Sequence, residues 1–255
     1  ESKLSILKDK EKAAGEGSAE RSMEQAMEHK RTLEEWAKRY VFLCIGLTIM
    51  AFGVACSIKG ALGTSPISSV PYTVNQFAPL TVGTATICMH VVFIAFQILL
   101  LRRRYDPMQL IQLPIALVFG YLTDAALWAV DWIACSAYWQ QWLVCLAGIF
   151  LVAVGVSCEV IADVAVLAGE GVVLAICKVA PIRFSTMKVC FDVTLVLTAC
   201  ALSLAFLGQI AGVREGTLAA ALLVGLLTRK IRGPLSRVEG WFSPRSGARA
   251  EQPAG

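Results

Sequence analysis

The chain carries little charge for its length. Only 16% of its 255 residues are Asp, Glu, Lys or Arg, whereas 56% are hydrophobic. A soluble domain is usually about a quarter charged. The deficit is greatest inside the chain, because residues 40–58 and 80–101 contain no formal charge. Since about 20 apolar residues cross a bilayer as a helix, this composition excludes an ordinary soluble domain and predicts a multi-pass membrane protein.

The chain also lacks the residue clusters that most enzymes and metalloproteins require. Its nine cysteines form no CxxC pair, so we expect them to be small packing residues rather than metal ligands or disulfides. No HExxH, GxSxG or Walker A motif occurs. We therefore predict that the protein is not an enzyme, has no catalytic residue and uses no metal or cofactor.

Six apolar runs are predicted to cross the membrane as helices, which makes the fold class an all-α membrane protein. They are residues 40–58, 80–101, 110–130, 141–158, 189–207 and 217–228. The last run has only 12 residues and becomes long enough if it extends back across Arg214 and Glu215. The tryptophans and tyrosines between Trp128 and Trp142 are typical of a membrane–water interface.

Basic residues near the ends of these runs predict the orientation, because they favour the cytosolic side. Such residues cluster at 102–104, after the second run, and at 229–232, after the sixth. We expect both clusters and both chain termini in the cytosol, in the inner membrane of a bacterium. Residues 1–39 then form a charged cytosolic segment, either a helix on the membrane surface or a solvated chain. Residues 40–232 form the membrane domain, and residues 233–255 form a basic, disordered tail.

An internal repeat is the most informative feature of the sequence. Residues 45–101 match residues 147–203 at an offset of 102 without a gap, with 12 identities in 57 positions. The identities include glycine, cysteine and proline pairs in one register, which a chain rich in Ala, Leu and Val does not easily produce by chance. With three more residues of offset, residues 119–123 align with residues 224–228.

The repeat divides the membrane domain into two halves of three spans each, about residues 40–131 and about residues 139–231. Because three is an odd number, the second half begins on the opposite side of the bilayer. The prediction is a pair of inverted repeats, an arrangement that many secondary transporters use.

Each half contains one short interrupted segment, residues 59–79 in the first and residues 161–181 in the second. In the first segment, Thr64 or Ser65 suits the N-cap of a helix and Pro66 suits its first position. Paired interruptions point to a central site, because the free N–H groups of a short helix can face a solute. The alternative is that both segments are loops outside the membrane.

Polar residues in these segments are the candidates for substrate binding. The first segment supplies hydroxyl and amide groups that can orient a small polar ligand, although small polar residues also mediate helix packing. The second supplies carboxylates that can bind a cationic solute or a coupling ion, or that form structural ion pairs or a solvated loop. The predicted binding residues are Ser65, Ser68, Ser69, Asn75, Asp163 and Glu170.

His90 and Asp192 are the candidates for proton or ion coupling. They are repeat mates; His90 lies about ten residues into the run of residues 80–101, and Asp192 lies near the start of the run of residues 189–207. Ionisable residues within spans are costly, so they are functional hypotheses by default. The alternative for His90 is a structural hydrogen bond to a neighbouring helix.

The stretch GVACSIKGALGTSPISSVPY, with LGTSP at residues 62–66, resembles the YczE/YyaS/YitT group of bacterial membrane proteins. The sequence TVG at residues 81–83, followed by an apolar span and a basic loop, is similar to the same group. The resemblance covers roughly residues 40–232. It implies an integral inner-membrane protein that is usually supposed to be a transporter, and it brings no known substrate or site residues.

These features together predict a secondary transporter, or permease, for a small polar or charged metabolite. The expected partners are the lipid bilayer and a small-molecule solute, with no nucleic acid; a homo-oligomer is left open. Two other functions also fit the sequence. One is a membrane-embedded substrate-binding subunit of a larger machine, and the other is a scaffold or assembly factor that recruits a partner through residues 1–39.

Overall fold

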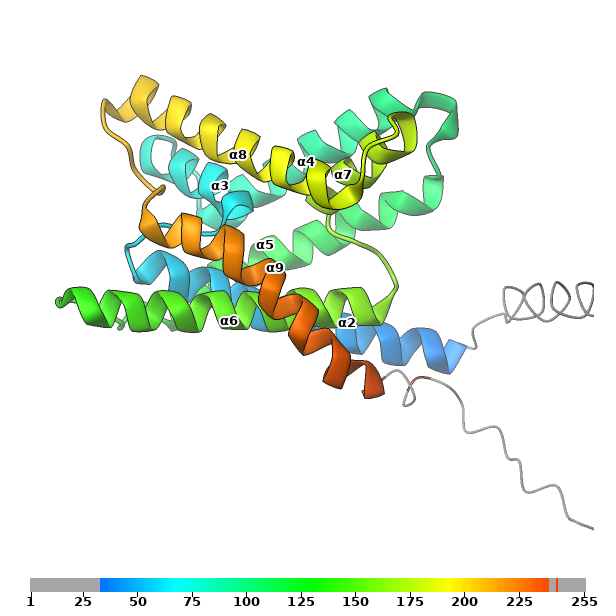
Figure 1. Cartoon of the computed structure of the whole chain (residues 1–255), viewed down its shortest axis with the longest axis horizontal. Coiled ribbons are helices and arrows are strands. Elements are labelled where there is room, and N and C mark those ends of the chain that lie inside the picture. Colours follow the sequence, from blue (N-terminus) through cyan, green and yellow to red (C-terminus); the bar gives the residue numbers. More distant parts are fainter. Residues whose placement is uncertain (1–32, 239–241, 243–255) are drawn as a thin grey trace, which may run out of the picture. The chain divides into compact units, whose positions relative to one another are not determined.

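The computed structural model describes residues 33–238 and 242, and every regular element in that part of the chain is a helix (Figure 1). The all-α fold class is thereby confirmed. The chain divides into two units, residues 1–37 and 38–255, and the packing described below lies within the second. Most of the predicted N-terminal segment and tail falls outside the described residues. Within the predicted tail, residues 233–238 are helical.

Six long helices and two short ones make up the structure (Figure 1). The long helices are α2 (Leu33–Lys59), α4 (Val82–Leu101), α5 (Gln112–Ala129), α6 (Tyr138–Ala162), α8 (Phe184–Leu207) and α9 (Glu215–Leu235). The short helices are α3 (Pro66–Phe77) and α7 (Ala168–Val179). Single 3₁₀ turns are η1 (Arg102–Arg104), η2 (Pro107–Ile111) and η3 (Ser236–Val238).

Five of these helices are long and apolar enough to cross a membrane: α2, α4, α5, α6 and α8. The sixth predicted span lies within α9, which begins at Glu215 and has 21 residues. Three basic residues in its last turns, Arg229, Lys230 and Arg232, make α9 less apolar than the other five helices.

The outer faces of the long helices carry large apolar side chains. Leu99 and Leu197, for example, are 68% and 64% exposed. A hydrocarbon solvent suits such faces, whereas water does not. Trp128 and Trp132 at the connection between α5 and α6 are more than 80% exposed, as expected of aromatic residues at a headgroup interface.

The two halves of the chain repeat their helix boundaries at the same offset of 102. The short helices α3 and α7 correspond at both ends, and α4 and α8 begin at corresponding residues. Even an unusual backbone conformation is shared, because Ala61 and its mate Asp163 both have positive φ, 55° and 48°. The sequence repeat is therefore also a repeat of local structure.

Helices α2 and α6 cross at four glycines that are repeat mates of one another. A β-carbon on Gly53 would lie 2.8 Å from the Gly148 carbonyl oxygen, and one on Gly46 would lie 3.2 Å from the Gly155 carbonyl oxygen. Residue numbers rise along α2 as they fall along α6, so the two helices are antiparallel. We call these four residues the glycine seam. It brings the backbones close enough to exclude any larger residue.

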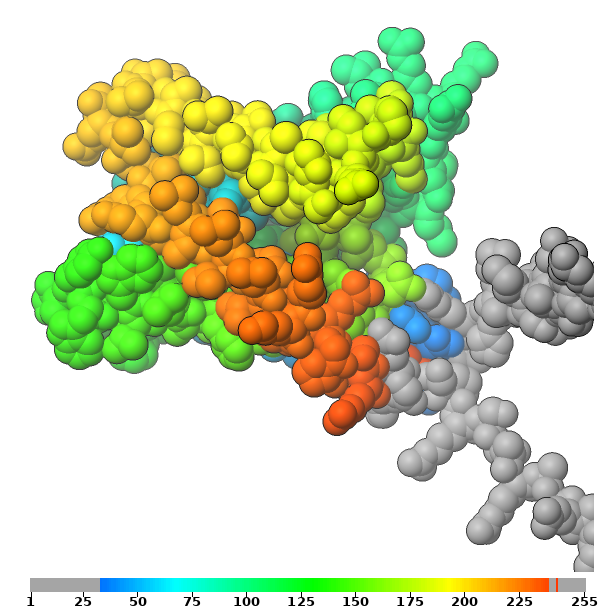
Figure 2. Space-filling view, viewed as in Figure 1, coloured from blue at the N-terminus to red at the C-terminus, as the bar shows by residue number. Residues whose placement is uncertain are grey.

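The remaining long helices have different packing partners. Helix α5 lies along α4, whereas α9 lies along α6. An apolar core joins α2, α5 and α6, with Leu47, Phe119 and Val152 among its buried residues. The space-filling view shows the surface hollowed between α8 and α9 (Figure 2).

Candidate functional site

The short helices α3 and α7 meet at their N-terminal ends. The Ile67 side chain on α3 lies so close to Gly169 on α7 that a β-carbon on this glycine would collide with Ile67 Cδ1. The two residues are repeat mates, 102 apart. Because a helix N-terminus carries free N–H groups and positive dipole charge, two such ends converge here. Helix α8 packs on α3 and α4 packs on α7, so long helices flank the meeting point.

The first turn of α3 brings three of the predicted serines together. Ser65 is the N-cap residue and Pro66 begins the helix, as predicted. The Ser65 hydroxyl donates to the Ser68 hydroxyl at 3.0 Å, and the Ser69 hydroxyl donates to the Pro66 carbonyl at 2.6 Å. All three serines are buried. The hydroxyl of the preceding residue, Thr64, is also buried and has no hydrogen-bond partner among the described residues.

Two glutamates lie at the beginning of α7. Glu159, near the end of α6, is only 2% exposed, and its Oε1 accepts a hydrogen bond from the Leu167 N–H at 2.6 Å. Glu170 lies in the first turn of α7 and is half-buried. Carboxylates in this position are stabilised by the helix dipole.

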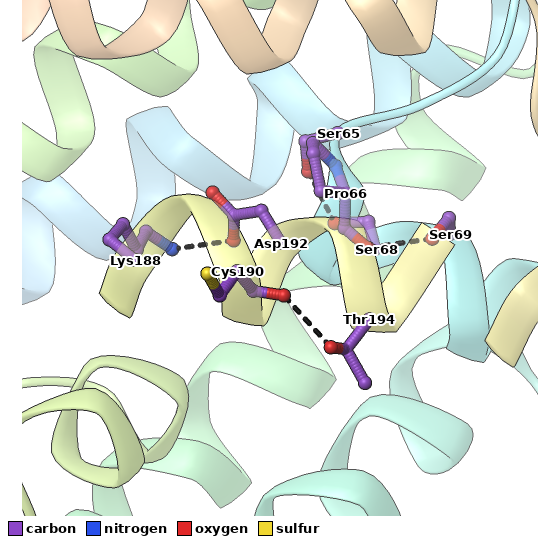
Figure 3. A network of polar contacts seen from close by, with 8 residues as sticks. All are labelled: Ser65, Pro66, Ser68, Ser69, Lys188, Cys190, Asp192 and Thr194. Atoms are coloured by element: carbon purple, nitrogen blue, oxygen red, sulfur yellow. Dashed lines mark hydrogen bonds and ion pairs between the residues drawn. The ribbon is translucent and has the colours of Figure 1, made fainter. Parts of the chain in front are cut away.

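Helix α8 adds an ion pair beside the start of α3. Lys188 Nζ donates to Asp192 Oδ1 at 2.9 Å, and both side chains are half-buried. Figure 3 shows this pair on α8 close to the serines of α3, in agreement with the packing of these two helices.

These groups form one electrostatic cluster around the meeting point. Glu170 interacts by charge with Glu159, Lys188 and Asp192. Lys188 Nζ also lies 5.8 Å from the centre of the Phe191 ring, and that ring packs beside Gly169. The cluster thus combines three carboxylates and one ammonium group with two helix N-termini. We call Glu159, Glu170, Lys188 and Asp192 the charged cluster.

Among the described residues, His90 makes no hydrogen bond with Asp192. It is 1% exposed on α4, its ring neighbours are Phe93 and Phe119, and neither ring nitrogen has a hydrogen-bond partner among the described residues. Asp192 is bound by Lys188 instead. Helix α4, which carries His90, packs on both short helices, as does α8, which carries Asp192. Their role in ion coupling stays a prediction.

Asn75 and Asp163 are also outside the charged cluster. Asn75 lies near the C-terminal end of α3, where its side-chain nitrogen donates to the Leu80 carbonyl at 2.7 Å. At 1.5 Å per residue, it is about 15 Å along the helix from Ser65. Asp163 is exposed and ends α6 in a left-handed conformation. The structure gives both residues a role in shaping turns, and it does not bring either to the meeting point.

Gln97 is a polar residue near the site that the sequence reasoning missed. Its side chain is fully buried, and its Nε2 donates to the Ala168 carbonyl at 3.0 Å and to Gln112 Oε1 at 3.2 Å. Its Oε1 has no partner among the described residues. The available signal was that Gln97 is the only amide in the run of residues 80–101.

Asp124, an acidic residue within α5, is explained by local structure. Its two carboxylate oxygens accept from the Gly83 N–H at 2.7 Å and from the Thr81 hydroxyl at 2.6 Å. It therefore caps the N-terminus of α4 from the neighbouring helix α5. The described residues contain no group of three or more His, Cys, Asp or Glu that could hold a metal ion.

The arrangement suits a small solute that carries polar or charged groups. The helix N-termini and Lys188 attract negative groups, the three carboxylates attract positive ones, and the serine hydroxyls accept or donate hydrogen bonds. The fold and these buried polar groups define the protein as a multi-pass helical membrane protein with a polar centre.

Comparison with known sequences agrees with this class. The chain belongs to the family described as "Family of unknown function (DUF6198)", which matches residues 37–232. It is also similar to the "Uncharacterized membrane protein YczE" of Bacillus subtilis (strain 168), with 28% identity over 199 residues. The match covers 77% of this chain and 86% of that relative. The predicted family resemblance is confirmed. No solved structure matches.

Proposed function

We propose that the protein is a secondary transporter that moves a small polar or charged solute across the bacterial inner membrane by alternating access. In this proposal the two halves are inverted repeats, with α3 and α7 as short helices that enter the membrane without crossing it. The solute binds where their N-termini meet, between the serines of α3 and the charged cluster.

The observation that carries this proposal is the contact between Ile67 and Gly169. If a two-fold axis relates the two halves, mates can touch each other only at that axis, so this contact supports such an axis. The antiparallel glycine seam supports the same axis, since its two contacts, Gly46 with Gly155 and Gly53 with Gly148, are exchanged when each glycine is replaced by its repeat mate. Half-helices that meet at such an axis are how many transporters place a solute near the bilayer midplane.

The proposal is tested by uptake into proteoliposomes that contain the purified full chain. A panel of small amines, amino acids and carboxylates first identifies a transported solute. Glu170→Gln and Ser68→Ala are then compared with the unaltered protein. Loss of a charged or hydrogen-bonding contact to a ligand typically costs about 1.5–3 kcal/mol, so we expect uptake at low solute concentration to fall about tenfold or more.

A matched control is Asp131→Asn, which makes the same chemical change outside the site. Asp131 is largely exposed and pairs with Lys59 at 2.6 Å. Exposed pairs contribute little to stability, so this variant should transport normally. Uptake that survives both Glu170→Gln and Ser68→Ala would refute the site, and the absence of uptake for every solute in the panel would refute transport by the isolated protein.

A further inference from the structure

A cavity of about 250 Å³ lies between the α6–α7 loop, α7 and the beginning of α5. It is on the same side of the helices as Arg102–Arg104, because Leu101 and Asp106 are part of its wall. The polar side chains that line it are Asp106, Gln109, Gln112 and Lys178. The corresponding region in the other half of the chain contains no such space, because its two walls are in contact.

The two main walls of the cavity have clear repeat mates. Val164, Ala165 and Val166 of the α6–α7 loop correspond to Leu62, Gly63 and Thr64 at the offset of 102. Gln109, Ile111 and Gln112 on the opposite wall correspond to Arg214, Gly216 and Thr217 at the offset of 105. Both walls therefore have an identifiable counterpart at the other end of the molecule.

At that other end the two walls are in direct contact. The Gly216 N–H donates to the Leu62 carbonyl at 2.8 Å, and Arg214 Nη1 donates to the Ala61 carbonyl at 2.9 Å. A β-carbon on Gly63 would collide with Thr217 Oγ1, so no space is left there. The same two elements are thus joined in one half and separated by a cavity in the other.

The side chains next to these walls also differ between the closed end and the cavity. Tyr72 packs on the closed end, where a β-carbon on Gly212 would lie 2.6 Å from its ring. Its mate Leu174 lines the cavity instead. The inner wall of the cavity includes Gly171, and a β-carbon on this residue would lie 2.8 Å from the buried Gln97 amide. The cavity therefore reaches Gly171 near the beginning of α7, the residue that follows Glu170 in the chain.

We propose that this cavity is the open entrance to the central site and that the contact of residues 61–64 with residues 212–217 is its closed counterpart. The proposal rests on the proposed function and specifies its two gates. When the walls around the cavity close, the contact at the other end opens. Each gate consists of the loop before a short helix and the beginning of the last helix of the opposite half.

The test is a labelling experiment that needs no known substrate. In the purified full chain with its nine cysteines replaced by serine or alanine, one cysteine is introduced at Val166 or at its mate Thr64. A charged maleimide is added and the labelling rate is measured by mass spectrometry. We expect Val166→Cys to react at least about tenfold faster than Thr64→Cys, which corresponds to a preference for one state of about 1.4 kcal/mol or more.

The decisive variant is Gly63→Ala, which forces a methyl group into the closed contact. Its φ of +98° also disfavours any side chain. We expect Thr64→Cys to label several-fold faster and Val166→Cys, at the far end, to label several-fold more slowly. The matched control is Gly225→Ala, because nothing lies within 4 Å of a β-carbon at that position. Both labelling rates should stay unchanged in the control.

A second variant, Arg214→Ala, removes the hydrogen bond to Ala61 together with the exposed ion pair to Glu215 at 3.4 Å, and it should shift both rates in the same directions. It replaces Gly63→Ala if that variant does not fold. Faster labelling of Thr64→Cys without protection of Val166→Cys would overturn the proposal, because the two ends would then move independently. Opposite changes at the two ends without uptake of any solute would support the gates and refute the transport function instead.

Discussion

At the scale of single residues, two buried polar side chains on α4 differ in what holds them. Gln97 gives both hydrogens of its amide to oxygens, those of Ala168 and Gln112. His90 has no hydrogen-bond partner among the described residues. A buried polar group without a partner keeps its full desolvation cost, whereas a bonded one recovers most of it. Gln97 therefore recovers part of its desolvation cost, although its Oε1 has no partner among the described residues, whereas His90 recovers none through hydrogen bonds to those residues.

This contrast predicts opposite effects of two similar substitutions. His90→Leu should raise the free energy of unfolding by about 1 kcal/mol, because it removes an uncompensated polar group. Gln97→Leu should lower it by about 1–3 kcal/mol, because it leaves the buried Ala168 carbonyl and Gln112 amide without their donor. Thermal unfolding of the purified variants in detergent measures both. A lower stability for His90→Leu would show that the imidazole has a favourable contact, such as a bound water or ion.

At the scale of helices, the glycine seam determines how the two halves meet. A β-carbon on Gly148 would collide with Ser57 Oγ and would lie 2.7 Å from the Gly53 carbonyl oxygen. Backbone atoms cannot move aside as a flexible side chain can. The two helices must therefore move apart to accept even one methyl group. This movement would also open the interface between the two halves.

Gly148→Ala is accordingly expected to lower the free energy of unfolding by about 1–3 kcal/mol, the usual cost of overpacking. Gly225→Ala in α9 is the matched comparison, since nothing lies within 4 Å of its β-carbon. It should raise stability by about 0.5–1 kcal/mol through helix propensity alone. Thermal unfolding distinguishes the two. Equal effects of both substitutions would mean that α2 and α6 do not pack at these residues.

The sequence predicted the short helices well because their signals are local. Ser65 and Pro66 mark the beginning of α3, and the repeat transfers that boundary to α7, which has no such signal of its own. The sequence could not predict the partner of Asp192. A repeat identifies equivalent residues, but it does not say which of them touch their mates, as Ile67 and Gly169 do, and which are held by other residues, as Asp192 is by Lys188.

At the scale of the whole molecule, the family match and the membrane helices have nearly the same extent. The match begins at residue 37 and ends at residue 232, so the charged N-terminal segment lies almost entirely outside it. A transporter whose mechanism lies in the repeats does not need that segment, whereas a scaffold that recruits a partner through it does.

Deletion of residues 1–32 separates these two functions. We expect the shortened protein to insert into membranes and to take up solute at the same rate as the full chain, because the deletion leaves every described helix intact. The measurement is uptake per molecule in proteoliposomes, with the amount of inserted protein determined on the same samples. Full insertion with complete loss of activity would favour the scaffold instead.

The glycine seam also determines when the two halves can pack during biosynthesis. Gly53 and Gly148 are separated by 95 residues of chain. A ribosome that adds about 5–20 residues per second needs roughly 5–20 seconds to make that length. During this interval α2 is already complete, but the helix that covers its glycines does not yet exist. The glycines of newly made α2 therefore have no partner helix during this time. The first half of the chain can reach its final packing only after α6 of the second half has been made.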